Sequence, residues 1–329
     1  MLVPRVDIST LVTGRDNAPV AAAIDAACRD TGFFSIVGHG VEVARLRQLD
    51  ALAREFFALD EQEKNEIAMA RGGRAWRGWF PVGGELTSGV PDRKEGIYFG
   101  AELGADDPRV RAGVPLHGPN LFPRRPAALR EAVLHHLRVM TELGHALMRG
   151  VGLALGLAPD WFERELTADP TILFRIFCYP PMSSTESPNP EWGVQEHTDY
   201  GLLTILGQDD VGGLQVRSNA GWIDVPPDPD AFVCNIGDML ERMTGGRYRS
   251  TPHRVRNTST ASRLSFPFFF DPGWAAEIRA VPEIAGGAPS RDTAARWDGA
   301  NVHELTGTYG AYLLSKVSKV FPELTTDVL

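Results

Sequence analysis

Residues 197–206 read His197-Thr198-Asp199-Tyr200-Gly201-Leu202-Leu203-Thr204-Ile205-Leu206, and this stretch decides the fold as well as the chemistry. In an extended strand, residues two apart point to the same face, so His197 and Asp199 can bind one metal ion. The apolar, β-branched run that follows is typical of a buried strand. The stretch therefore predicts a metal-binding pair at the start of a β-rich core.

A third metal ligand is expected from another strand, because facial ligands converge from separate directions. His253 suits this role, since Pro252 biases the residue before it towards an extended conformation. Two imidazoles and one carboxylate are the ligand set of non-haem Fe(II) oxygenases, which leave coordination positions open. The alternative is a surface pair of His197 and Asp199 with a separate, hydrogen-bonded His253. A single His-x-Asp is a weak motif in a chain with 8 histidines.

A candidate carboxylate clamp begins at Arg263. The segment 263–270 reads as a strand, and its alternation places Arg263, Ser265 and Phe269 on one face. Arg263 offers a planar pair of donors and Ser265 a third hydrogen bond, which together suit a carboxylate near the metal. Tyr179, on the same strand face as Arg175, is a second candidate for this contact. A half-buried core tyrosine is an equally good interpretation of Tyr179.

From residue 171 onward, short β-rich runs alternate with turns, and this pattern favours a double-sheet jelly roll, also called a double-stranded β-helix. The expected fold class is α+β, with helices flanking this core. The predicted strands are 171–179, 201–206, 214–216, 222–225, 232–235, 249–255 and 263–270, and the predicted helices are 18–30, 126–157 and 302–321. Asn17 is the expected cap of the first helix.

We expect the chain to form a single compact unit over residues 1–329, because it contains no internal repeat and no low-complexity linker. Residues 1–123 would form an N-terminal support region. Residues 124–329 would contain the long helix and the jelly-roll core, which spans about 171–272.

Composition narrows the class of protein and its partners. The chain has 329 residues, is 43% hydrophobic and can bury a large core. Its net charge of -9 argues against nucleic acid as a partner. No run reaches the ~18 apolar residues of a membrane span, and no secretion signal is visible, so we expect a cytoplasmic enzyme with no membrane partner. Cys28, Cys178 and Cys234 are expected to be reduced and buried. No obligate protein partner is inferred.

Nine segments spread along the chain carry a common pattern: Val3–Ser9, Gly32–Gly40, Pro91–Glu95, Gly118–Pro123, Tyr179–Pro181, His197–Leu206, Gly212–Val216, Asn235–Asp238 and Arg263–Phe270. Together they resemble the isopenicillin N synthase-like family of 2-oxoglutarate- and Fe(II)-dependent oxygenases, and the resemblance runs nearly end to end.

The resemblance implies an activity. 2-Oxoglutarate would occupy two positions on Fe(II), O2 would take the last, and Arg263 would pair with the distant carboxylate of 2-oxoglutarate. A small-molecule substrate would then be oxidised, with release of succinate and CO2. Hydroxylation is the expected outcome, and desaturation or ring closure is the alternative.

Two other functions stay open. Some family members do not use 2-oxoglutarate and bind the carboxylate of the main substrate through the same arginine and serine. A protein of another class, a metal- or small-molecule-binding sensor without turnover, is less consistent with five intact groups.

Substrate contacts are expected in the loop 71–87, which combines arginines, tryptophans and glycines. Arg74 and Arg77 would suit an anionic substrate, while Glu85 and Thr87 resemble substrate-contacting positions of the ethylene-forming branch of the family. The alternative is a solvated loop anchored by its tryptophans. Phe269 is a further candidate for the pocket wall. His39, His117, His135, His136, His145 and His303 are expected to have structural roles.

Overall fold

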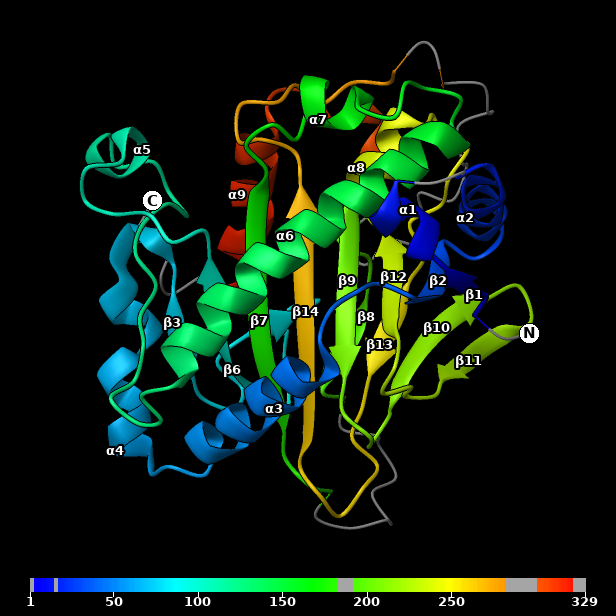
Figure 1. Cartoon of the computed structure of the whole chain (residues 1–329). Coiled ribbons are helices and arrows are strands. Elements are labelled where there is room, and N and C mark those ends of the chain that lie inside the picture. Colours follow the sequence, from blue (N-terminus) through cyan, green and yellow to red (C-terminus); the bar gives the residue numbers. More distant parts are fainter. Residues whose placement is uncertain (1–2, 15–16, 183–191, 282–283, 285–300, 322–329) are drawn as a thin grey trace.

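A computed structural model describes residues 3–14, 17–182, 192–281, 284 and 301–321. Within these residues the strands form a large sheet, a smaller sheet and a two-stranded hairpin, and helices flank them (Figure 1). The α+β jelly-roll class predicted from the sequence is confirmed.

The eight-stranded sheet, here called the major sheet, carries the order β1-β2-β12-β9-β14-β7-β6-β3. Apart from the parallel pair β1 and β2, neighbouring strands are antiparallel. Its strands are β1 (Arg5–Asp7), β2 (Phe33–Val37), β12 (Phe232–Ile236), β9 (Leu203–Gln208), β14 (Arg263–Asp271), β7 (Thr171–Tyr179), β6 (Glu95–Gly100) and β3 (Gly78–Phe80).

The four-stranded sheet, here called the minor sheet, has the order β11-β10-β13-β8. Its strands are β11 (Gly221–Val225), β10 (Leu214–Ser218), β13 (His253–Val255) and β8 (Val194–His197), and the separate hairpin joins β4 (Leu86–Thr87) to β5 (Val90–Pro91). A cavity lies between the sheets, because side chains of both line it. This cavity holds the site described below.

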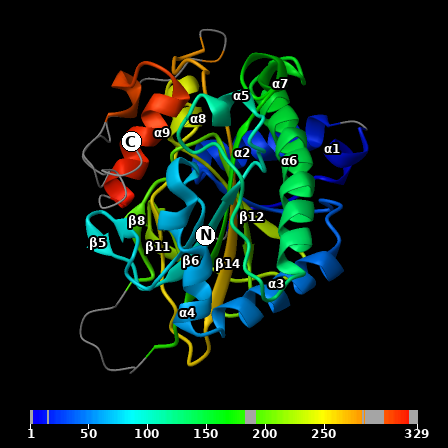
Figure 2. The ribbon, with the colours of Figure 1, turned by 90° about the vertical axis from the view of Figure 1, so that its left-hand side faces the viewer.

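Helices cover both sides of this arrangement. The long helix α6 (Leu129–Ala154) crosses one face of the major sheet, and α9 (Tyr309–Val320) lies on the other side, as Figure 2 shows. The helix α6 comes close to β14 at Gly144, where a Cβ would lie 2.3 Å from the Phe270 ring. The other helices are α1 (Ser9–Thr13), α2 (Ala18–Asp30), α3 (Val43–Phe57), α4 (Glu61–Lys64), α5 (Pro108–Arg111), α7 (Trp161–Glu165), α8 (Asp238–Met243) and the 3-10 turns Asn65–Ile67, Met69–Ala75 and Val302–Glu304.

Most predicted elements are present, with three instructive differences. The predicted strand 249–255 shortens to β13, because the backbone N–H groups of Arg249 and Ser250 donate to Cys28 O and to the Glu241 side chain instead of to a neighbouring strand. Asn17 precedes α2 but makes no side-chain capping bond. The predicted helix 302–321 begins with a 3-10 turn and becomes α9 only at Tyr309.

The strands β3 and β6 were not predicted. They extend the major sheet beyond β7 with residues of the N-terminal region, and Tyr98 and Gly96 pair with Arg175 and Phe177. None of the helices in the described part of the chain is long and apolar enough to cross a membrane.

Candidate active site

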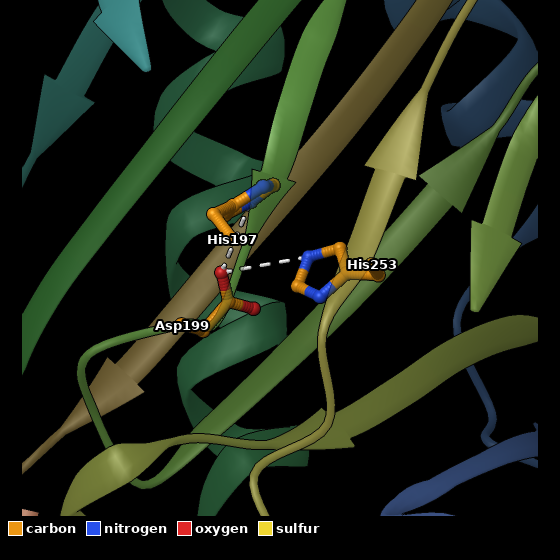
Figure 3. Close-up of side chains that lie close together, drawn as sticks. All are labelled: His197, Asp199 and His253. Carbon is orange, nitrogen blue, oxygen red and sulfur yellow. Dashed lines mark ion pairs between the residues drawn. The ribbon is translucent and has the colours of Figure 1, made fainter. Parts of the chain in front are cut away.

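Three side chains that line the cavity point toward one another (Figure 3). His197 ends β8, His253 begins β13 opposite it in the minor sheet, and Asp199 follows two residues after His197. The Nε2 atoms of His197 and His253 lie 3.8 and 3.7 Å from Asp199 Oδ1. Within the described ranges, no other group of three or more His, Cys, Asp or Glu side chains converges in this way. The geometry is that of a 2-His-1-carboxylate face.

Hydrogen bonds fix the orientation of both imidazoles. The Nδ1 atom of His197 lies 2.8 Å from Gln195 O, and that of His253 lies 3.2 Å from Thr251 O. These carbonyl oxygens accept from Nδ1–H, which leaves each Nε2 lone pair pointing to the shared centre. Burial lowers the pKa of both rings, that of His253 to about 4. Both imidazoles are therefore neutral near pH 7, which is the form that binds a metal.

The carboxylate of Asp199 is held through its second oxygen. Asp199 Oδ2 accepts hydrogen bonds from Thr204 Oγ1 at 2.5 Å and from Asn235 Nδ2 at 2.7 Å, which leaves Oδ1 for a metal. Burial alone would raise the pKa of Asp199, but the two imidazoles and these donors lower it. Asp199 was predicted to lie in an extended strand, and this prediction is wrong. The strand β8 ends at His197, because the Asp199 carbonyl accepts from Asp238 N outside the sheet.

Arg263 offers an unpaired donor inside the cavity. Its side chain is fully buried at the start of β14, where Nε donates to Gly212 O and Nη2 donates to Gln208 Oε1 at 3.2 Å. The remaining nitrogen, Nη1, is buried and has no hydrogen-bond partner. A buried guanidinium nitrogen without an acceptor is costly, so the site fits an anionic group that would accept from it.

Two hydroxyl groups lie beside this guanidinium. Tyr179 pairs with Arg263 across β7 and β14, its ring lies 4.8 Å from the Arg263 guanidinium carbon, and its hydroxyl is 3.3 Å from Ser265 Oγ. Arg263, Ser265 and Tyr179 all line the cavity. Together they form a cradle in which a carboxylate would meet one charged donor and two hydroxyl donors.

A cluster of charged side chains also lines the cavity. Glu85 Oε2 lies 3.0 Å from Lys94 Nζ, Glu85 Oε1 lies 3.6 Å from Arg175 Nη1, and Tyr98 donates its hydroxyl to Glu85. Burial alone would raise the pKa of Glu85, but Lys94 and Arg175 lower it below its usual range. The Arg175 guanidinium lies over the rings of Tyr98 and Phe269, and its Nε has no hydrogen-bond partner.

Only part of the loop 71–87, which was expected to contact the substrate, lines the cavity. Glu85 and Thr87 line the cavity, as does Phe269 on the Arg263 face of β14. Arg74 and Arg77 do not line it. Arg74 is exposed on the 3-10 turn before β3, and Arg77 is buried elsewhere, where it donates to Leu116 O.

The physical reason is a sharp change of direction before β3. Trp76 adopts a left-handed conformation, with φ 54°, and is buried at 1% exposure. The tryptophan therefore anchors the chain, as the alternative interpretation of this loop expected, and the two arginines point elsewhere.

The remaining histidines and the cysteines lie away from the three convergent ligands. His136 on α6 is buried 4.6 Å from the Phe174 ring, and burial lowers its pKa to about 3. His145 packs on Phe270 from the same helix. Cys28, Cys178 and Cys234 are free and buried, as predicted.

Sequence reasoning assigned no role to Arg175, Lys94 or Tyr98. The residue types alone gave little signal, because β6 was not predicted. The alternation in β7 already placed Arg175 on the face of Tyr179, and a charged side chain on the inner face of a core strand was the signal that could have found it.

Comparison with known proteins identifies the family. Residues 170–272 match the model of the 2OG-Fe(II) oxygenase superfamily, and residues 3–125 match that of the non-haem dioxygenase in morphine synthesis N-terminal region. A probable iron/ascorbate oxidoreductase of Dictyostelium discoideum is 47% identical over 94% of this chain and 91% of its own length.

Two further relatives cover nearly the whole chain. The 1-aminocyclopropane-1-carboxylate oxidase of Dictyostelium mucoroides is 37% identical over 98% of this chain and 95% of its own. A homoarginine-6-hydroxylase of Arabidopsis thaliana is 35% identical over 97% of both chains.

Solved structures agree. A putative 2OG-Fe(II) oxygenase family protein of Caulobacter crescentus superimposes with a TM-score of 0.79 at 25% identity, covering 96% of this chain and 98% of that one. JOX2, crystallised with 2OG, Fe and JA, gives a TM-score of 0.74 at 27% identity, covering 96% of this chain and 85% of that one. The chain described here therefore belongs to the 2OG-Fe(II) oxygenase superfamily and is a 2-oxoglutarate- and Fe(II)-dependent oxygenase.

Proposed function

We propose that His197, Asp199 and His253 bind Fe(II), and that Arg263, Ser265 and Tyr179 bind the distant carboxylate of 2-oxoglutarate. The observation that carries the second assignment is the buried Nη1 of Arg263, which has no acceptor within the described protein. A carboxylate beside it would gain a charge-assisted hydrogen bond, and the Ser265 hydroxyl would supply a neutral one.

The residues of the site act mainly by holding groups in place. The backbone carbonyls of Gln195 and Thr251 keep the proton of each imidazole on Nδ1, and Thr204 and Asn235 keep Asp199 Oδ1 directed to the metal. When bound, Fe(II) together with O2 and 2-oxoglutarate supplies the oxidising power, with succinate and CO2 as the co-products. The apolar wall contributed by α9, which includes Leu313 and Val317, limits the entry of water.

The substrate is proposed to be a small amino acid, and hydroxylation is its proposed reaction. Arg175, with an unpaired Nε in the cavity, suits the carboxylate of such a molecule, and Glu85 with Thr87 suits its amino group or a cationic side chain. Two relatives support this class, since 1-aminocyclopropane-1-carboxylate and homoarginine both carry a carboxylate and an amino group. The free thiols Cys28, Cys178 and Cys234 are consistent with the cytoplasmic setting that the sequence predicts.

The test is an anaerobic titration of the Fe(II)-loaded protein with 2-oxoglutarate, followed by the visible charge-transfer band that chelation produces. The wild-type protein should give a saturable band. Arg263→Leu should bind 2-oxoglutarate about 30-fold more weakly, because losing a charge-assisted hydrogen bond costs on the order of 2 kcal/mol. The matched control is Arg77→Leu, which removes another buried arginine with an unpaired nitrogen but one outside the cavity.

The possible results of this titration test the clamp, the co-substrate and the substrate class separately. A band with wild-type affinity in Arg263→Leu would contradict the clamp. No band with iron bound would favour an oxidase that does not use 2-oxoglutarate, in which Arg263 binds the main substrate. Iron binding without oxidation of any amino acid would count against the proposed substrate class.

A further inference from the structure

Residues 199–202, here called the metal-binding loop, are fixed by a second set of contacts besides those from Asn235 and Thr204. Asp271, the last residue of β14, is 3% exposed, and its Oδ1 accepts a hydrogen bond from Leu202 N at 3.0 Å. Leu202 follows Asp199 by three residues, so this bond fixes the turn directly after the metal ligand. A Cβ at Gly201 would lie 1.4 Å from Asp271 Oδ1, so the turn and the carboxylate fit only because residue 201 is glycine.

The other oxygen of Asp271 ties this turn to the C-terminal helix. Tyr309, the first residue of α9, is fully buried, and its hydroxyl donates to Asp271 Oδ2 at 2.6 Å. The side chain of Asp271 therefore bridges the backbone of the metal-binding loop and the start of α9. Asp271 lies on β14, the strand that also carries Arg263.

A parallel connection runs one turn further along α9. The hydroxyl of Tyr312 donates to Asp238 Oδ2 at 3.2 Å, and the backbone N–H of Asp238 donates to the carbonyl of Asp199 at 2.8 Å. Both tyrosines of α9 thus bond to an aspartate that itself bonds to the loop 199–202. These side chains are buried, so water does not compete freely for the bonds.

From these contacts we infer that Asp271 is a positioning residue for the metal ligand Asp199, and that α9 is part of the same support through Tyr309 and Tyr312. The inference rests on the proposed role of Asp199 as a metal ligand. Leu313, Val317 and Phe321 of the same C-terminal segment wall the cavity, so the hydrogen bonds of Tyr309 and Tyr312 connect the segment that carries this wall to the metal-binding loop. Loss of the Asp271 contacts should therefore weaken metal binding and alter its geometry, in addition to any loss of stability.

The test measures anaerobic Co(II) binding by calorimetry, together with the visible ligand-field spectrum of the Co(II) protein, at a temperature where every variant is folded. Asp271→Ala should bind Co(II) roughly 10- to 100-fold more weakly, the range typical for loss of an outer partner of a metal ligand. Asp271→Asn should stay close to the wild-type protein, because its amide oxygen can still accept from Leu202 N and its amide nitrogen can donate to the Tyr309 hydroxyl oxygen. Tyr309→Phe should have an intermediate effect and shift the spectrum.

The matched control is Asn120→Ala. Asn120 is buried and its Oδ1 accepts from Gly100 N at 2.9 Å, so the variant removes the same type of side-chain bond to a backbone N–H in the N-terminal region. It should lower the melting temperature and leave Co(II) affinity and spectrum unchanged. The inference is overturned if Asp271→Ala keeps both, or if Asn120→Ala weakens Co(II) binding as much.

His197→Ala distinguishes failure of the metal site from failure of this inference. If His197→Ala binds Co(II) as tightly as the wild-type protein, the proposed metal site and the role of Asp271 are both wrong. If His197→Ala loses Co(II) while Asp271→Ala and Tyr309→Phe retain it unchanged, only the role of Asp271 is wrong.

Discussion

Two groups of residues line the cavity, and they differ in how their polar atoms are satisfied: the proposed metal end (His197, Asp199, His253 and Arg263) and the proposed substrate end (Glu85, Lys94 and Arg175). At the metal end, the imidazole Nε2 atoms and Arg263 Nη1 point inward, while their other polar atoms are bonded to the protein. At the proposed substrate end, Glu85 lies between Lys94 and Arg175 and Lys94 also pairs with Asp92, so two carboxylates face two cations. The metal end is thus built for fixed ligands. A substrate bound at the proposed substrate end would have to compete with existing ion pairs, so we expect substrate specificity to be set there.

The largest effect is expected from His197→Ala, which breaks the metal end. Iron affinity and turnover should fall by more than the roughly 10- to 100-fold that loss of an outer hydrogen-bond partner causes. Iron content after anaerobic loading and succinate release would measure this. Stoichiometric iron and normal turnover in this variant would remove the basis for the comparison between the two ends.

Arg175→Leu should act on the substrate end alone. Because truncating one member of a buried charge pair costs about 2 kcal/mol or more, KM for the substrate should rise about 30-fold or more. Affinity for 2-oxoglutarate, measured by the charge-transfer titration, should stay at the wild-type value. If instead 2-oxoglutarate affinity falls and KM for the substrate does not, the two ends have been assigned the wrong ligands.

Asn235→Leu sharpens the description of the metal end. It removes the amide that donates to Asp199 Oδ2 and leaves the Thr204 hydroxyl as the other donor to that oxygen. We expect Co(II) affinity to fall about 10-fold, near the lower end of the effects of outer partners. Thr204→Val is the companion variant, and an equal loss in both would indicate that the two donors contribute alike. Unchanged affinity in both would show that Asp199 Oδ2 needs neither donor.

The smallest effect on activity is expected from His136→Leu, since His136 lies on α6 away from both ends. Burial lowers the pKa of His136 to about 3, below its ordinary value of 6.5, so the unfolded chain binds the proton more readily than the folded one. Stability from this group is full above pH 6.5 and decreases as the pH falls towards 3. Between about pH 7.5 and about pH 5 the decrease should be about 2 kcal/mol.

Urea unfolding at both pH values measures this decrease. His136→Leu should reduce the pH dependence by that amount and leave turnover intact. The control is His135→Leu, which changes the preceding histidine of α6 and keeps His136. A loss of turnover in His136→Leu would mean that α6 influences the site more than the contacts of His136 suggest.

Alternation along single strands made much of the site predictable. Arg263, Ser265 and Phe269 lie on one face of β14 because successive side chains of a strand alternate, and Tyr179 joins them by the same rule on β7. The pairing of His197 with Asp199 was predicted for a partly wrong reason, since the strand ends at His197. Arg77 was expected at the cavity but does not line it, because Trp76 before it adopts a left-handed conformation that a residue type does not reveal.

The sequence by itself predicted the proposed metal ligands, the proposed carboxylate clamp and the jelly-roll class, because these depend on residue types at short spacing within strands. Only the tertiary structure decided that β6 carries Tyr98 against Arg175, that Lys94 meets Glu85, and that Asp271 joins the metal-binding loop to α9. The physical reason is that these contacts, apart from that of Lys94 with Glu85, join residues at least 38 positions apart in the sequence. Their formation depends on strand order and chain direction, which local spacing does not encode.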